Sequence, residues 1–138
     1  IDFFEDVYSS EWIYLIDLNK AMFQFFIDEL GIKVKIIEAK ELDLNGSKSS
    51  LVLDMCKKLN AETYIFGQNG KEYADVKEFQ KCGINLIFQD YKHPIYKQNS
   101  NDFVSHLSIL DLLFRYGGNS LDLILSGNVD KGIINDQD

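Results

Sequence analysis

Basic charge is scarce in this chain, which has 14 Lys and Arg residues against 22 Asp and Glu residues and a net charge of −8. Arg115 is the only arginine, and the lysines are scattered along the chain. A protein that binds nucleic acid needs a basic stripe to neutralise the phosphate backbone, and this sequence has none. We therefore expect no nucleic-acid partner.

Cysteine and histidine are also few, with two residues of each. Cys56 and Cys82 lack the spacing of a metal-binding pair and lie beside core-type residues, so we expect reduced, structural thiols. Two histidines without a Cys-x-x-Cys pair give little support to a metal site. The sequence predicts no tightly bound metal, and it identifies no other cofactor.

Long hydrophobic runs are missing as well. The apolar segments are short and interrupted by charge, so we expect no membrane span. The start of the chain lacks the basic, apolar and small-residue regions of a signal peptide. Together with reduced thiols, these features predict a cytoplasmic protein. The first residue is Ile rather than Met, so we expect that an N-terminal part of the same protein is missing here.

The chain has enough apolar residues to form the hydrophobic core of one domain. Hydrophobic residues make up 46% of the 138 residues and aromatic residues make up 13%. No linker rich in Pro, Ser or Gly divides the chain, and Pro94 is its only proline. We predict a single α/β domain over residues 1–126, followed by a polar tail over 127–138.

Helical and strand patterns alternate along the chain. Apolar residues at helical spacing predict a helix over 10–30, capped by Ser10 and closed by Gly31. Further helices are predicted over 51–59, 76–82, 107–116 and 119–125. Short runs rich in β-branched and apolar residues predict strands over 32–38, 63–66 and 84–88.

This alternation predicts an α/β fold with three layers. Strands that alternate with helices are joined by right-handed crossovers and pair in parallel. We expect a mostly parallel open sheet with helices on both faces and a helical C-terminal segment. In that sheet the neighbours are Val34, Ile65 and Ile87, and the helices face it with Leu53, Cys56 and Phe79.

A glycine-rich polar loop follows the predicted strand 63–66. Gly67 and Gly70 lack Cβ atoms, Asn69 tolerates left-handed geometry, and Lys71 supplies a positive charge. Between a strand and a helix, such a loop can line an anion pocket with backbone amides. The same residues also suit an ordinary strand-to-helix turn, and the pattern alone leaves both interpretations open.

A second polar cluster follows the predicted strand 84–88. Asp90 lies three residues before His93, a spacing at which a carboxylate can orient an imidazole and raise its basicity for general-base catalysis. The alternative is a polar turn in which His93 caps backbone groups. Both clusters leave the carboxyl ends of predicted parallel strands, where ligands bind in open α/β sheets. We therefore predict a ligand site at this edge.

Three segments carry a resemblance to a known family. They are Tyr64–Tyr73, Phe88–Gln98 and Phe103–Phe114, and the second contains the specific pattern Gln-x-Tyr-x-His-Pro-x-Tyr-x-Gln. In order and spacing they resemble the WbqC-like protein family. The resemblance runs from about Leu15 to Leu125 and corresponds to the C-terminal two thirds of the family.

The resemblance implies a bacterial protein of surface-polysaccharide (O-antigen) biosynthesis. It implies an amino-acid (glycine) or acyl transferase that acts on a nucleotide-linked or phosphorylated sugar. Two departures from the family are clear: Asn69 stands where the family often has the first of two glycines, and the Met-Gln-Pro-Tyr type of start is absent. We assign general-base catalysis to His93, with Asp90 to orient it, and ligand binding to Gly67, Asn69, Gly70, Lys71, Gln89 and Tyr96.

A different class of function fits the same residues. The chain can be a non-catalytic sugar- or nucleotide-binding module, or a fold-maintaining partner of a glycosyltransferase. The sequence leaves open whether the protein is an enzyme, and it identifies neither donor nor acceptor, nor whether ATP is used.

Overall fold

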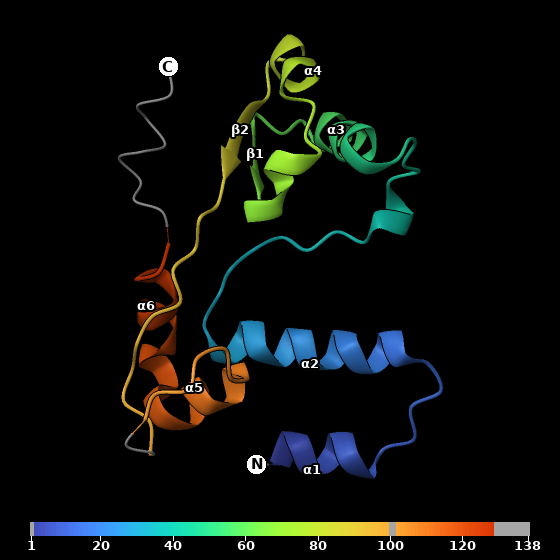
Figure 1. The fold of residues 1–138 in the computed structure, drawn as a ribbon. Helices are drawn as coiled ribbons and strands as arrows, with labels where there is room; N and C mark the ends of the chain where they lie inside the picture. Colours follow the sequence, from blue (N-terminus) through green and yellow to red (C-terminus); the bar gives the residue numbers. More distant parts are fainter. Residues whose placement is uncertain (1, 100–101, 129–138) are drawn as a thin grey trace. The chain divides into compact units, whose positions relative to one another are not determined.

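Strands β1 (Thr63–Phe66) and β2 (Asn85–Phe88) pair in parallel in the computed structural model, which describes residues 2–99 and 102–128 (Figure 1). The register places Ile65 opposite Ile87. Their connection contains the 3₁₀-helix η2 (Gln68–Glu72) and helix α4 (Val76–Lys81). The predicted parallel pairing of these two segments, with a helix between them, is confirmed.

Backbone contacts divide the chain into two units. The first consists of Ile1–Val34 and Lys97–Leu123, and the second consists of Lys35–Tyr96 and Ile124–Asp138. The second unit contains the strands, η1 (Ala39–Glu41), η2, α4 and α3 (Lys48–Lys58). The first contains helices and irregular segments, and no strand among its described residues.

The core of the second unit lies between the strands and the helices α3 and α4. Its buried residues are Cys56, Phe66, Phe79, Ile84 and Leu86, and Leu53 packs against them. Burying this apolar surface is the main stabilising contribution in so small a unit. The prediction that Leu53, Cys56 and Phe79 face the sheet is confirmed.

One face of the strand pair makes this core. Phe66 and Leu86 point into it, while Ile65, on the opposite face, is 58% exposed. The described residues thus form a mixed helix and strand fold with a two-stranded parallel sheet and a helical C-terminal segment. Helices on both faces, and hence three layers, are not confirmed.

The strand predicted over 32–38 is wrong. The segment is irregular, and it pairs with neither β1 nor β2. Val34 is 61% exposed, so its β-branched side chain does not pack on a sheet. Strand propensity describes how well a side chain fits a half-buried pleated surface. Without a paired strand, the backbone N–H and C=O groups of this segment form no inter-strand hydrogen bonds.

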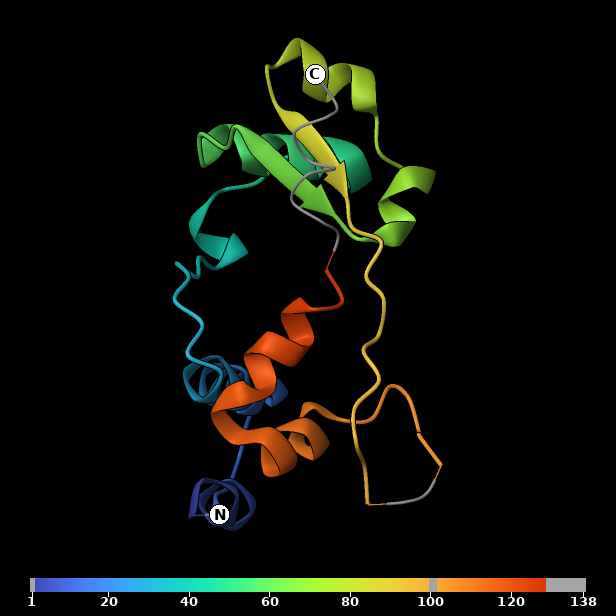
Figure 2. The same ribbon diagram turned by 90° about the vertical axis from the view of Figure 1, so that its left-hand side faces the viewer.

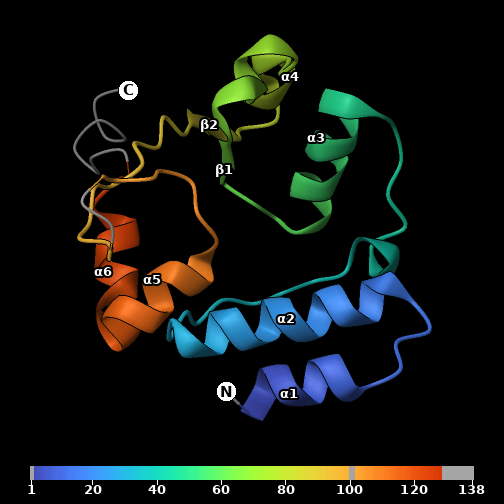
Figure 3. The same ribbon diagram turned by 60° about the horizontal axis from the view of Figure 1, so that its bottom comes forward.

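Stacked aromatic rings join the first two helices of the first unit. Helix α1 (Asp2–Ser9) lies beside α2 (Leu15–Glu29) in Figure 3. The ring of Phe25 stacks on Phe3 at 4.0 Å between centroids and meets the edge of Phe4 at 5.3 Å. Such pairs add to the burial of the rings themselves.

Helices α5 (Ile109–Tyr116) and α6 (Ser120–Leu125), joined by η3 (Gly117–Asn119), complete the helical segment predicted at the C-terminal end. The buried hydroxyl of Ser120 donates to the carbonyl of Leu112 at 3.3 Å. This bond ties the first turn of α6 to α5.

The predicted helix start at Ser10 is wrong. Helix α2 begins at Leu15, with Tyr14 in extended conformation before it and no side-chain cap. The Ser10 hydroxyl instead donates back to the Asp6 carbonyl at 2.6 Å, at the end of α1. A short polar side chain can satisfy the end of the preceding helix as well as the start of the next one.

The helix ends predicted from glycine agree better with the structure. Gly31, with φ of +65°, follows α2, and Gly83, with φ of +71°, follows α4. Glycine adopts this left-handed geometry without steric cost.

Across residues 2–99 and 102–128, no helix is both long and apolar enough to cross a membrane.

Candidate functional site

The two predicted clusters leave the same end of the strand pair. Phe66 is opposite Phe88, and the backbone N–H of Gln89 donates to the Phe66 carbonyl at 2.8 Å, which continues the ladder beyond β2. Figure 2 shows both strand arrows ending on one side, where η2 begins and the chain leaves β2. The edge predicted from the sequence is therefore formed within one unit.

The glycine-rich loop folds back over the strand that precedes it. Gly70 is buried, and a Cβ atom there would lie 2.7 Å from atoms of the Phe66 ring. Its N–H donates to the Gly67 carbonyl at 2.9 Å, so this amide is used inside the loop. The structure therefore gives Gly70 a packing role that the sequence did not predict.

The other loop residues are exposed. Gly67 has open space around it and an extended backbone with φ of −66°. Asn69 lies within η2 and does not have a positive φ, so it does not adopt the left-handed geometry that asparagine tolerates. Gly67, Asn69 and Lys71 remain accessible to a ligand.

Charged side chains of both loops lie near the strand ends. The hydrogen bond and ion pair from Lys92, at 2.9 Å, are the main causes that lower the pKa of Asp90, and the charge of Lys71 lowers it further. The Lys71 ammonium also lies 5.9 Å from the ring centre of Phe88. The cation of the first loop thus lies at the end of β2, where the second loop begins.

His93 has a defined hydrogen bond on one side of its ring. Its Nδ1 lies 2.9 Å from the Pro94 carbonyl oxygen. A carbonyl oxygen accepts only, so Nδ1 carries the proton, and the Nε2 of a neutral ring carries the lone pair. The ring of Tyr96, which is buried, lies 6.3 Å from that of His93.

The predicted pairing of Asp90 with His93 stays a prediction. The carboxylate of Asp90 forms an ion pair with Lys92, and the Pro94 carbonyl supplies a direct partner to the imidazole. Both residues nevertheless come from the segment that leaves β2. His93 is half-buried and Asp90 is exposed.

The start of the predicted polar tail supports this segment. Lys92 N–H donates to the Gly127 carbonyl at 2.8 Å, and the amide of Gln89 donates to Asn128 Oδ1 at 2.9 Å. Gly127 is buried against the ring of Tyr91. Gly127 and Asn128, the first two residues of the predicted polar tail, thus hold the strand-end segment. The rest of the tail, 129–138, lies outside the described residues.

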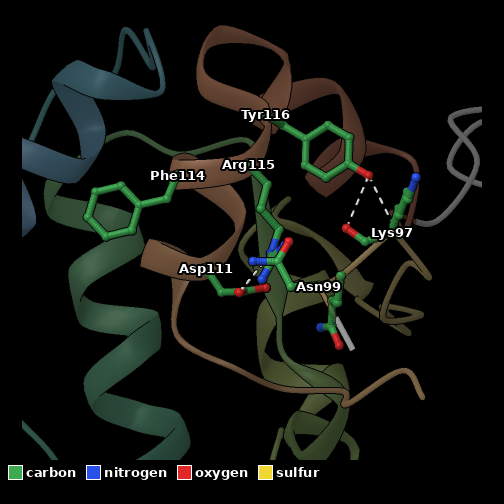
Figure 4. Close-up of a pocket in the computed structure, with 7 residues that line it drawn as sticks. Lys97, Asn99, Asp111, Phe114, Arg115 and Tyr116 are labelled. Atoms are coloured by element: carbon green, nitrogen blue, oxygen red, sulfur yellow. Dashed lines mark hydrogen bonds and ion pairs between the residues drawn. The ribbon is translucent and has the colours of Figure 1, made fainter. Parts of the chain in front are cut away.

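The first unit contains a pocket that the sequence patterns did not predict. It has a volume of about 610 Å³ and is lined by Lys97, Gln98, Asn99, Asp111, Phe114, Arg115 and Tyr116 (Figure 4). One sequence signal could have indicated this pocket, because Arg115 is the only arginine and Asp111 lies one helical turn before it.

No group of three or more His, Cys, Asp or Glu residues in the described part of the chain is placed to hold a metal ion.

Comparisons with known proteins agree with the family resemblance. The model of the WbqC-like protein family matches residues 1–123. The uncharacterized protein Rv1507c of Mycobacterium tuberculosis is 28% identical over 108 residues, which are 78% of this chain and 47% of that protein. The chain therefore spans about half the length of this curated relative. No solved structure matches. The match over residues 1–123 shows that the chain belongs to the WbqC-like protein family.

Proposed function

We propose that this protein binds a nucleotide-linked or phosphorylated sugar at the ends of β1 and β2. It transfers an amino-acyl group such as glycyl, or another acyl group, to that sugar in bacterial surface-polysaccharide (O-antigen) biosynthesis. The observation that carries the proposal is the position of the Lys71 ammonium 5.9 Å from the ring centre of Phe88, which places the cation of the first loop at the end of β2, where the second loop begins. Ligand binding at such a point is typical of α/β folds.

The anionic part of the ligand binds the first loop. Lys71 supplies the positive charge, and the exposed backbone of Gly67 and Asn69 allows close approach. Gly70 contributes by letting the loop fold over Phe66. Gln89 and Tyr96 position the rest of the substrate.

His93 is the general base in this proposal. Its Nε2 takes a proton from the acceptor amine or hydroxyl, the acceptor atom bonds to the acyl carbon, and the donor's leaving group departs with its electron pair. Asp90 orients the imidazole by accepting from Nδ1–H, the one N–H of the neutral ring, in place of the Pro94 carbonyl. General-base catalysis contributes about 10²–10⁴ in rate. The reaction belongs in the cytoplasm, where activated sugars are available.

A non-catalytic sugar- or nucleotide-binding module is the second candidate. The side chains of Gln89 and His93 both bond to other groups of the protein, as expected if they maintain the fold and a partner surface. In that case the strand-end loops present the ligand to a glycosyltransferase. Binding is common to both candidates, and only acyl transfer separates them.

Binding is tested by titration calorimetry and thermal melting of the 138-residue chain with UDP-glucose and glucose 1-phosphate. A ligand at 100 times its dissociation constant adds about 2.7 kcal/mol of stability. Lys71→Ala should weaken binding at least about tenfold, as expected for loss of a charge-assisted contact. Lys77→Ala, which removes an exposed lysine of α4, should not. Equal affinity in both variants would exclude the loop as the anion site.

Catalysis is tested by mass spectrometry of the sugar after incubation with glycine and ATP, or with acetyl-coenzyme A. His93→Gln should keep the melting temperature and sugar binding but lose transfer. His106→Asn is the control, because it removes the other histidine and retains a side chain that tolerates the positive φ of 60° there. Sugar binding without transfer by the wild type favours the binding module.

A further inference from the structure

Hydrogen bonds hold one wall of the pocket of the first unit. Lys97 N–H donates to the Tyr116 hydroxyl at 3.0 Å. The amide of Gln98 donates to the Val104 carbonyl and accepts from the Val104 N–H, both at 2.8 Å. The backbone on this side is thus bonded to α5 and to residue 104. Both ends of the Gln98 amide are used in this way.

Arg115 lies between Asp111 and Asn99 (Figure 4). Its Nε donates to Asp111 Oδ1 at 2.8 Å and its Nη1 donates to Asn99 Oδ1 at 2.7 Å. A guanidinium has five N–H groups, so these two bonds leave three that no described residue takes. The side chains of Arg115 and Asp111 are only 22% and 20% exposed, which holds the guanidinium in one orientation.

The polar groups facing the pocket are mainly donors. Because the oxygen of Asn99 accepts from Arg115, the two N–H groups of its amide are left for another partner. Lys97 is also among the residues that line the pocket. The carboxylate of Asp111 is already paired with Arg115, and the Gln98 amide is already used. The remaining N–H groups of Arg115 and Asn99 can therefore donate to a ligand that is rich in hydrogen-bond acceptors.

We propose that this pocket binds the oxyanion, phosphate or carboxylate, of a small sugar-like molecule. Arg115 and Asn99 donate to the oxyanion, and the planar guanidinium suits either group. Phe114 lines the same pocket and is 72% exposed, which offers an apolar face to a sugar ring. The volume of about 610 Å³ accommodates such a ligand. This inference does not rest on the proposed function, since its residues all belong to the first unit.

A purely structural role for Arg115 is the competing explanation. Asp111 and Arg115 are four residues apart on α5, where ion pairs support helices. Such a pair predicts an effect of Arg115 on stability and no effect on a ligand. The experiment therefore measures both quantities.

The only arginine of the chain allows a direct assay, because its Nε–H gives a single signal in a proton–nitrogen correlation spectrum. The probes are glucose 1-phosphate, glucuronate and neutral glucose, at constant ionic strength, added to the full chain. We expect saturable shifts of the Arg115 signal and the Asn99 amide with one or both anions and none with glucose. The stronger of the two anions identifies the oxyanion class.

Arg115→Gln should weaken anion binding at least about tenfold, which is the loss expected for charge-assisted hydrogen bonds. Lys33→Gln changes the net charge equally at an exposed position of the same unit and should leave binding unchanged. Arg115→Lys, which keeps the charge and loses the planar fork, should bind more weakly than wild type and separates binding from any loss of stability. The proposal is overturned if neither anion shifts the Arg115 signal, if glucose shifts it equally, or if Lys33→Gln weakens binding as much as Arg115→Gln. Lys71→Ala has no effect in this assay, so failure here is distinct from failure at the strand ends.

Discussion

Gly70 lies directly against the ring of Phe66, with no room for a Cβ atom. Gly70→Ala should therefore destabilise the protein by about 1–3 kcal/mol, the typical cost of overpacking. Gly67→Ala is the matched control, because a Cβ at Gly67 meets nothing within 4 Å and the φ of −66° suits alanine. Urea unfolding measures both. A loss in Gly67→Ala equal to that in Gly70→Ala would contradict the packing argument.

Gly127 holds the segment that leaves β2. A Cβ at Gly127 would lie 2.8 Å from the Tyr91 ring and still closer to the Lys92 carbonyl. Gly127→Ala should separate the two segments and weaken the bond from Lys92 N–H to the Gly127 carbonyl. We expect hydrogen exchange of the Lys92 amide to rise about two- to tenfold, as for loss of one hydrogen bond. Gly118→Ala, where a Cβ meets nothing within 4 Å, should leave it unchanged.

Phe79 is fully buried in the core of the second unit. Phe79→Ala should lower the free energy of unfolding by about 3–5 kcal/mol, through lost burial and a residual cavity. Ile65→Ala removes an apolar side chain that is 58% exposed, and it should cost less than about 1 kcal/mol. Denaturation of both variants checks the difference. Similar losses would mean that Ile65 is covered in solution.

The carboxylate of Asp90 should titrate below its ordinary range. The Lys92 hydrogen bond and charge are the main causes that lower its pKa, and Lys71 adds a smaller effect. A lowered folded-state pKa contributes stability that is present at neutral pH and is lost as the pH falls through that pKa. In carboxyl NMR titrations, Lys92→Ala should raise the pKa of Asp90 more than Lys71→Ala. No change in Lys71→Ala would show that the two loops do not approach.

The two cysteines should differ in reactivity. Burial raises the pKa of the Cys56 thiol, which is 1% exposed in the core, whereas Cys82 is exposed. Iodoacetamide at mildly alkaline pH should modify Cys82 within minutes and Cys56 only after unfolding, because the thiolate is the reactive form. Mass spectrometry of wild type and Cys82→Ser identifies the modified site. Rapid alkylation of folded Cys82→Ser would contradict the buried position of Cys56.

Local signals in the sequence determined many of the elements. The strand Thr63–Phe66 has the predicted limits, and α4 and β2 each differ from the predicted segments by one residue. Apolar periodicity and glycine after a helix act over a few residues, so they are readable without the fold. The placement of two polar clusters at one edge also followed from the sequence, because a crossover makes successive strands parallel.

Tertiary contacts decided the remaining features. Val34 has a β-branched side chain that favours strands, but its segment pairs with no strand of the described residues. Ser10 bonds backward to α1 instead of capping α2. Arg115 meets Asn99 across 16 residues, a pairing that no local pattern encodes. The need for glycine at Gly70 arises from the ring of Phe66, which only the folded chain brings against it. Which groups become neighbours depends on packing between distant segments, and local composition does not specify that packing.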